Sequence, residues 1–320
     1  MSRAGAHAGR LHPEEQFVFA MVFALMATFV VVITMSAVRS SMNSLIPGGA
    51  VAGSSQTIPA GTGGTAGRAA TGAGGHAIQP ATPRLNVSLA AAIGPALRAY
   101  PGHLAVGVID ETTGQQALYG STRRFRSGSI VTADILAALL IRQQHAGTPV
   151  TSDQAVLATA MLNNGSAAAA SALWRDIGEG NGLASANRVL KLRQTIPGTG
   201  DSWDQTTTTV RDQLQLLVDL TSGQSPLRAA SRDYLMRMLA GSGSQPRWGV
   251  FAIGNGSVAQ EGWQQAGARW ATNSVGVVAH SGHVLLVVIL SSGTASQAAG
   301  TSLASAAAVA AAGVMVRPGH

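Results

Sequence analysis

Residues 125–140 read FRSGSIVTADILAALL, a short serine-rich turn that runs directly into an apolar helical pattern. The large aliphatic residues from Ile130 to Leu140 recur at spacings of three and four, which predicts a helix. Unpaired backbone N–H groups point outward at a helix start, so Ser129 occupies a position suited to a nucleophile beside an oxyanion site. An ordinary helix-capping serine occupies the same position. Other parts of the chain must therefore distinguish the two roles.

Composition narrows the possible functions of the 320-residue chain. Apolar residues make up 46% of it, enough for a core in one or two domains. The net charge of +7 comes almost entirely from arginine, since Lys191 is the only lysine. Scattered basic residues and 4% aromatic content do not fit a nucleic-acid surface, whereas the charge fits attraction to anionic lipid or cell-wall polymer. The absence of cysteine excludes disulfides, thiolate metal sites and a cysteine nucleophile.

Residues 17–38 form an uncharged apolar stretch, FVFAMVFALMATFVVVITMSAV. The stretch is long enough to cross a hydrocarbon core of about 30 Å, and it exceeds the apolar region of a cleavable signal peptide. Arg3 and Arg10 precede it, which favours an N-terminus on the inner side. We therefore predict a short cytoplasmic tail (1–16) and a single-pass signal anchor in the cell membrane, with the remaining chain outside the cytoplasm.

Residues 39–84 consist mainly of Gly, Ala, Ser, Thr and Pro. Such a segment buries too little apolar surface to offset its ordering entropy, so we predict a disordered linker. A folded domain is expected over residues 85–316, followed by a tail at 317–320.

The pattern within residues 85–316 is α+β. Two strands, a helical block, three further strands and a final helix predict an antiparallel sheet, with the last helix on one face and a helical subdomain inserted. The expected strands cover residues 104–110, 115–119, 248–253, 270–278 and 284–290. The expected helices cover residues 89–100 with a break at Gly94-Pro95, the serine-led stretch, 152–239 with three breaks, and 297–314.

The order of these elements and several strings resemble the class A β-lactamase-like serine hydrolases of the penicillin-binding-protein superfamily. The strings are the serine-led stretch, MLNNGSAAAASALWRDIG at residues 161–178, and the return to the sheet with Gly262-Trp263 and NSVG at 273–276. The resemblance covers about residues 85–316. It implies a five-stranded antiparallel sheet flanked by helices and an all-helical subdomain, preceded here by one transmembrane helix.

The resemblance also implies where catalytic residues would lie. In this superfamily a serine attacks an acyl carbon, a lysine three residues later helps to take its proton, and a Ser-Asp-Asn loop adds a hydroxyl and an amide. Ser129 matches the nucleophile, but Thr132 occupies the lysine position. Gly165 occupies the serine position of Ser-Asp-Asn, and Ser166 follows one residue late.

A Lys-Thr-Gly strand binds the substrate carboxylate in such enzymes, and the residue after it completes the oxyanion hole. Gln260, Glu261 and Gly262 occupy these positions, followed by Trp263. No glutamate lies between residues 190 and 203, the region comparable to the deacylation loop. The mechanism uses two lysines and this chain has one, so the usual acyl transfer cannot be assembled in any register.

These departures predict a membrane-anchored, extracytoplasmic pseudoenzyme. Its β-lactamase-like domain would bind peptidoglycan or an envelope protein at residues 260–263, without a cofactor. The alternative is a divergent serine hydrolase acting on β-lactams, amides or esters, with Ser129 as nucleophile and an unrecognised base. A third hypothesis is that the chain serves only in assembly at the membrane.

The alternative needs a proton acceptor near Ser129. Glu261 is either a buried base in the cleft or a strand residue that faces water. Four histidines could also act, or could be solvated loop residues: His103, His145, His280 and His283.

Two further features of the sequence, a histidine pair and one aspartate, have more than one possible role. His280-x-x-His283 is half of a metal site, but no third ligand cluster accompanies it, so no metal is expected. Asp134, inside the serine helix, either pairs with an arginine such as Arg126 or faces solvent.

Overall fold

A computed structural model describes residues 82–241 and 247–316. The predicted anchor at 17–38, the two tails and nearly all of the predicted linker lie outside these residues. The first described helix, α2 (Pro83–Ala99), begins two residues before the expected domain start. The helix continues through Gly94-Pro95, where we expected a break. Its buried stripe, which includes Leu89 and Ile93, packs into the core and outweighs the local cost of proline.

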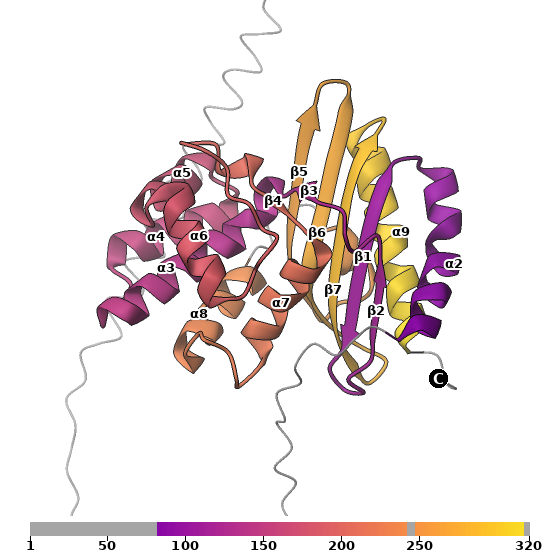
Figure 1. Cartoon of the computed structure of the whole chain (residues 1–320), viewed down its shortest axis with the longest axis horizontal. Coiled ribbons are helices and arrows are strands. Elements are labelled where there is room, and N and C mark those ends of the chain that lie inside the picture. The colour runs from indigo at the N-terminus through magenta and orange to yellow at the C-terminus, as the bar shows by residue number, and fades with distance from the viewer. Residues whose placement is uncertain (1–81, 242–246, 317–320) are drawn as a thin grey trace, which may run out of the picture. The chain divides into compact units, whose positions relative to one another are not determined.

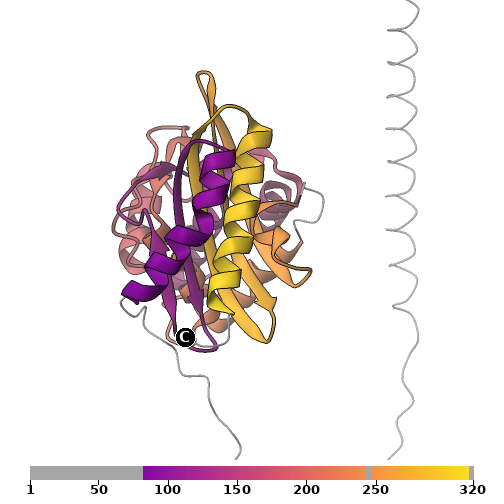
Figure 2. The ribbon, with the colours of Figure 1, turned by 90° about the vertical axis from the view of Figure 1, so that its right-hand side faces the viewer.

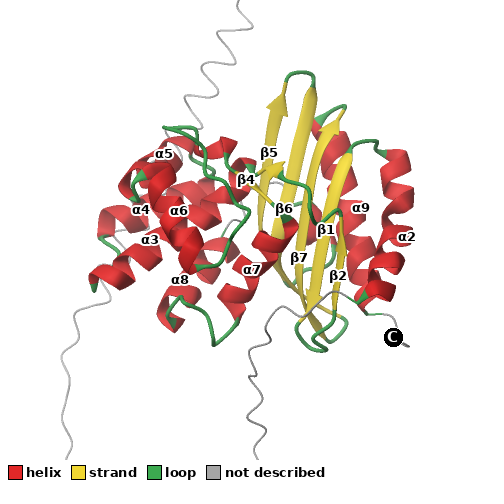
Figure 3. Cartoon of the chain, viewed as in Figure 1, coloured by secondary structure: helices red, strands yellow, loops and turns green. Residues whose placement is uncertain are grey.

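Five antiparallel strands form the main sheet in the order β2-β1-β7-β6-β5, which confirms the predicted sheet (Figure 1, Figure 3). β7 lies at the centre, and its residues 285–290 are fully buried. Burial on both faces explains why this strand reads as an unbroken apolar run. The strands are β1 (His103–Asp110), β2 (Gln116–Tyr119), β5 (Ser257–Ala266), β6 (Arg269–His280) and β7 (His283–Thr294).

The strand expected at residues 248–253 is wrong. This segment is a 3-10 turn, η4 (Gly249–Ala252), and the strand begins later, at Ser257. Gly249 has a φ of +59°, which is incompatible with an extended strand. The backbone N–H of Val250 donates to the hydroxyl of Ser274 at 2.9 Å, so the turn is tied to β6 by a side chain. The apolar side chains of Val250 and Ile253 therefore pack into the core although their backbone forms a turn.

Helices α2 and α9 (Gln297–Met315) cover one face of the sheet side by side (Figure 2). α9 is rich in alanine, and small residues allow its backbone to approach the strands closely. A Cβ on Gly300 would lie 2.7 Å from the side chain of Thr272. By length and composition α9 is apolar enough to span a membrane, but half of its most apolar window is buried in this structure. The helix therefore fits the role of a core helix.

The inserted helices lie on the other side of the sheet (Figure 1). α3 runs through their centre, and every residue from Val131 to Ile141 is buried. A two-stranded ribbon, β3 (Phe125–Arg126) with β4 (Thr207–Thr208), lies just before the serine turn. The helices are α3 (Val131–Ala146), α4 (Ser152–Asn164), α5 (Ala167–Asp176), α6 (Glu179–Val189), α7 (Val210–Thr221) and α8 (Ala229–Ala240).

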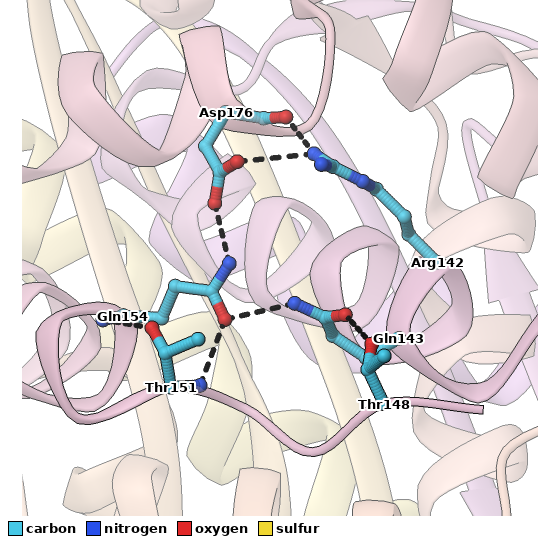
Figure 4. A network of polar contacts seen from close by, with 6 residues as sticks. All are labelled: Arg142, Gln143, Thr148, Thr151, Gln154 and Asp176. Atoms are coloured by element: carbon cyan, nitrogen blue, oxygen red, sulfur yellow. Dashed lines mark hydrogen bonds and ion pairs between the residues drawn. The ribbon is translucent and has the colours of Figure 1, made fainter. Parts of the chain in front are cut away.

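A polar network joins α3, α4 and α5 at their ends (Figure 4). The Asp176 carboxylate accepts from Gln154 Nε2 at 2.7 Å and from the Arg142 guanidinium at 3.1 Å. Gln154 also completes a reciprocal cap with Thr151 at the start of α4. These contacts fix the helix that follows the serine turn against its neighbours.

Asp134 is buried, contrary to both expectations for this residue. Its side chain is 1% exposed, and Gln213 Nε2 donates to its carboxyl oxygens at 3.2 and 3.4 Å. Burial raises the pKa of Asp134 from 3.8 to about 7. The reason is that α3 is enclosed on all sides along this turn, so no face of it reaches solvent.

The Asp134→Asn variant should reduce the pH dependence of stability. Between about pH 4 and 7 the folded protein keeps a proton on Asp134 that the unfolded chain has released, so wild-type stability falls as pH rises through this window. The variant's free energy of unfolding, relative to wild type, should therefore rise by on the order of 2 kcal/mol from pH 5 to pH 8. Urea unfolding at several pH values measures this difference. Asp233→Asn, which removes an exposed carboxyl on α8, is the control, and parallel pH curves for wild type and Asp134→Asn would contradict the expectation.

Candidate functional site

The serine turn is a 3-10 turn, η2 (Gly128–Ile130), held on two sides before α3 begins. Ser127 donates to the carbonyl oxygen of Thr206 through both its backbone N–H (2.8 Å) and its hydroxyl (2.9 Å). The buried side chain of Asn273 on β6 donates to the carbonyl oxygens of Arg126 and Ser127 at 2.8 and 2.9 Å. Ser129 is therefore placed by backbone contacts to two other segments, and it is partly exposed.

Strand β5 lies directly against this turn. A Cβ on Gly262 would lie 2.6 Å from the backbone nitrogen of Ile130 and 2.8 Å from that of Ser129. A Cβ on Gly128 would lie 3.2 Å from the carbonyl oxygen of Trp263. Only glycine permits this approach of two backbones. The contact brings Ser129 and Trp263 together, the two residues whose backbone N–H groups the resemblance assigns to an oxyanion hole.

A pocket of about 590 Å³ opens where the turn and β5 meet. It contains four of the predicted site residues: Ser129, Gln260, Glu261 and Trp263. The start of α9 and the segment before η4 close its other side, which local sequence patterns did not indicate. Those two segments contribute Arg247, Trp248, Gln297, Ala298 and Thr301. The end of α4 contributes Leu162 and Gly165, and Gly165 is the residue at the serine position of Ser-Asp-Asn.

Thr132 and Ser166 do not line the pocket. Thr132 is 3% exposed, and its hydroxyl donates to the carbonyl oxygen of Ser129 at 2.7 Å. Ser166 caps α5, where its hydroxyl accepts from the backbone N–H of Ala169 at 3.2 Å. Both hydroxyls therefore serve local helix structure, and neither replaces the proton-transfer group of the resembled mechanism.

Glu261 lies in the pocket as a partly buried side chain, so it is not simply a water-facing strand residue. Burial raises its pKa from 4.5 to about 8, against the lowering effects of the Ser274 hydroxyl and the Arg247 charge. The Ser274 hydroxyl donates to its carboxyl at 3.5 Å. The hydroxyl of Ser129 makes no hydrogen bond to any described residue, so Glu261 is a pocket neighbour without being a bonded partner.

The other candidate bases lie elsewhere. His283 Nδ1 is 2.8 Å from the Asp110 carboxylate at the far end of β1 and β7. His280 ends β6 beside the hairpin turn at Ser281 and Gly282. His103 begins β1 and His145 lies in the last turn of α3. None of the four histidines lines the pocket.

The only lysine of the chain, Lys191, lies outside the pocket lining. Lys191 follows α6 with a φ of +59°, and its side chain is exposed. Its charge lowers the pKa of Asp219, which burial raises. Over residues 82–241 and 247–316, no group of three His, Asp or Glu side chains could hold a metal ion. The pocket thus contains a hydroxyl and a carboxyl, with neither an amine nor an imidazole in its described lining.

Solved β-lactamases, class A enzymes among them, share this fold. The structure from Xanthomonas campestris is 19% identical over 72% of this chain and 98% of its own, with a TM-score of 0.62. The structure from Burkholderia vietnamiensis is 20% identical over 72% of this chain and 97% of its own, with a TM-score of 0.63. A class A β-lactamase from Mycobacterium abscessus is 16% identical over 72% and 100%, with a TM-score of 0.62. No protein-family model and no curated protein sequence matches the chain.

The Gly262→Ala variant should destabilise the domain and displace β5 from the serine turn. The added methyl group would overlap two backbone nitrogens, which cannot yield as a flexible side chain would. We expect the free energy of unfolding to fall by about 1–3 kcal/mol, measured by denaturant unfolding. The matched control is Gly223→Ala, which meets nothing within 4 Å and should change stability by less than about 0.5 kcal/mol. Equal effects of the two variants would refute the close contact.

Proposed function

We propose that this chain is a membrane-anchored, extracytoplasmic protein whose β-lactamase-like domain binds a cell-wall or envelope-protein ligand without forming an acyl-enzyme. The observation that carries this proposal is the composition of the Ser129 pocket. The described lining of the pocket contains neither an amine nor an imidazole. Thr132 occupies the position where the mechanism needs a lysine, and its hydroxyl donates to the Ser129 carbonyl oxygen. A serine hydroxyl without a basic partner is a weak nucleophile near neutral pH.

Ligand binding is supported by the size and lining of the pocket. Its volume of about 590 Å³ falls within the range of small-molecule sites, roughly 300–1,000 Å³. Trp248 and Trp263 supply aromatic surface, while Gln297 and Thr301 supply hydrogen-bonding groups from α9. Such a mixture of aromatic and polar groups is typical of a site that orients a ligand.

Placement outside the cytoplasm rests on the sequence. Residues 17–38 have the length and apolarity of a membrane anchor, and residues 39–81 have the composition of a tether. As a flexible coil, such a tether would span roughly 35–40 Å, which would let the domain reach ligands beyond the membrane surface. Peptidoglycan and envelope proteins are the partners that this placement favours.

A divergent serine hydrolase remains the second candidate because Glu261 shares the pocket with Ser129. A carboxyl group whose pKa lies near 8 is partly ionised at mildly alkaline pH and is able to accept a proton there. Its activity would rise as pH increases through 8, because only the ionised carboxylate accepts a proton. The backbone N–H groups of Ser129 and Trp263, where the serine turn meets β5, would then supply the oxyanion site.

Incubation of the full-length chain with a fluorescent penicillin should leave no covalent adduct on Ser129. Intact-mass measurement and gel fluorescence detect such an adduct, and a penicillin-binding protein, which deacylates slowly and keeps its penicilloyl adduct, is the positive control. Ser129→Ala should give the same negative result and should keep the wild-type melting temperature within a few degrees. An adduct that forms on wild type and disappears in Ser129→Ala would overturn the proposal. Ser129-dependent turnover in a panel of β-lactams, esters and amides, lost in Glu261→Gln, would establish the hydrolase instead.

Binding and assembly require a separate test. Pull-down from a membrane extract with the full-length chain, compared with a Trp263→Ala variant, should show retention of cell-wall fragments or an envelope protein that depends on the pocket. Retention that is identical for both chains would favour a role in assembly alone, because the pocket would then contribute nothing.

A further inference from the structure

Within residues 82–241 and 247–316, no cationic side chain forms an ion pair with Glu261. The ion pairs between described residues are Arg142–Asp176, Arg175–Asp201 and His283–Asp110, and none involves the pocket. Arg247 acts on the carboxyl through its field, without forming an ion pair within 4 Å. Its guanidinium lies over the ring of Phe251, 4.3 Å from the centroid. The pocket therefore contains an acidic group whose charge nothing in its described lining neutralises by contact.

A second acceptor in the same lining lacks a donor. Gln260 is 8% exposed, and its side-chain oxygen is buried without a hydrogen-bond partner in the part of the chain that the structure describes. Its side-chain nitrogen instead donates to the backbone carbonyl of Glu261 at 3.4 Å. An unpaired buried carbonyl oxygen is a hydrogen-bond acceptor that still lacks a donor. Both features favour a ligand group that donates hydrogen bonds and carries positive charge.

Indole surface completes the surroundings that suit a cation. Trp248 and Trp263 both line the pocket, and Trp263 is 51% exposed. Trp270 on β6 supports Trp263, with ring centroids 5.7 Å apart and planes tilted by 48°. The face of an indole ring attracts a cation, and tryptophan does so more strongly than other aromatic residues. An ammonium group in this pocket would meet a carboxyl group and aromatic surface together.

We propose that the pocket binds its ligand through a primary ammonium group, such as the free side-chain amine of a diamino acid in a cell-wall peptide. The ammonium forms an ion pair with Glu261 and lies against the indole surface of Trp263. This inference rests on the proposed ligand-binding function and names the chemical class of its ligand. A charge-assisted contact of this kind is also what a buried carboxylate requires in order to remain ionised.

The pairing makes ligand affinity depend on pH. At neutral pH the free protein holds a proton on Glu261, and an ammonium ligand displaces it. Below about pH 8 the affinity should therefore fall by up to tenfold per pH unit, while an alkyl amine with a pKa of about 10.4 stays charged.

No other group near Glu261 accounts for this titration. Ser274 faces the carboxyl from β6, Arg247 acts on it from before η4, and Gln297 and Thr301 of α9 are uncharged. η2 carries no charged residue, and the charged side chains of α8, which also packs on β5, have no resolved effect on the Glu261 carboxyl.

Two peptides that differ in one charge test the inference. The probes are Nα-acetyl-lysyl-D-alanyl-D-alanine, with a free side-chain amine, and its Nα,Nε-diacetyl form. Each is titrated into the full-length chain in a nonionic detergent by isothermal titration calorimetry at pH 6, 7 and 8. We expect the free-amine peptide to bind at least tenfold more tightly at pH 8, with the preference shrinking toward pH 6. Its binding should release a proton, seen as a dependence of the measured enthalpy on the buffer.

Variants assign the preference to Glu261. Glu261→Gln should abolish both the amine preference and the proton release. Glu111→Gln, which removes a carboxyl that accepts from Thr221 outside the pocket, should retain both. Thermal melting confirms that each variant is folded.

The outcomes separate this inference from the function on which it rests. Equal binding of the two peptides, lost in Trp263→Ala, would overturn the ammonium inference and leave ligand binding in the pocket intact. Absence of binding by either peptide at millimolar concentration would overturn the ammonium inference for cell-wall peptides, and the pull-down result would then decide the proposed function. An amine preference that survives in Glu261→Gln would also overturn the assignment.

Discussion

The site depends on the contact between two backbones, the serine turn and β5. At Gly262 the strand comes so close to Ser129 and Ile130 that a single methyl group would not fit. Asn273 holds the turn from the next strand, β6, through two carbonyl oxygens. This arrangement needs backbone atoms, one glycine and one buried amide, and it does not need the side chains that would carry out acyl transfer. Scaffold and chemistry are therefore separable here, which is consistent with a β-lactamase fold whose lysine positions hold other residues.

Two hydroxyl side chains at or next to the expected catalytic positions make local hydrogen bonds within the fold. Thr132 and Ser166, at or next to positions where a hydrolase would direct polar groups at the substrate, instead bond to their own helices. Ser166 satisfies the backbone N–H of Ala169, a donor that a helix start leaves unpaired, and Thr132 bonds back to the carbonyl oxygen three residues earlier. The serine turn keeps its shape without Lys-to-Ser contacts because Thr206 and Asn273 already define it. Loss of the proton-transfer groups thus leaves the local structure satisfied.

The sequence predicted the sheet and the serine helix because those elements follow local patterns. The apolar run of β7 and the three-and-four spacing of α3 reflect burial by neighbouring layers, which a single sequence records. The strand predicted at residues 248–253 is wrong because Gly249, with a positive φ, places this apolar segment in a turn. The sequence left the burial of Glu261 undecided and did not indicate that of Asp134, since the burial of a carboxyl depends on which distant residues enclose it. Gln213 and α9 supply that enclosure, and no local spacing indicates them.

The surroundings of Glu261 differ from those of Asp134. Asp134 accepts a hydrogen bond from Gln213 inside a closed helical core, where a neutral acid needs no ligand. Glu261 accepts a long hydrogen bond from Ser274 and opens into a pocket beside indole rings. A desolvated carboxyl with one weak partner costs stability, and a serine or glutamine at an edge strand would avoid this cost. A cationic ligand would offset the cost when it binds. The Glu261 carboxyl, which destabilises the free domain, would then stabilise the complex. A carboxyl enclosed in a core, such as Asp134, has no access to a ligand that could do this.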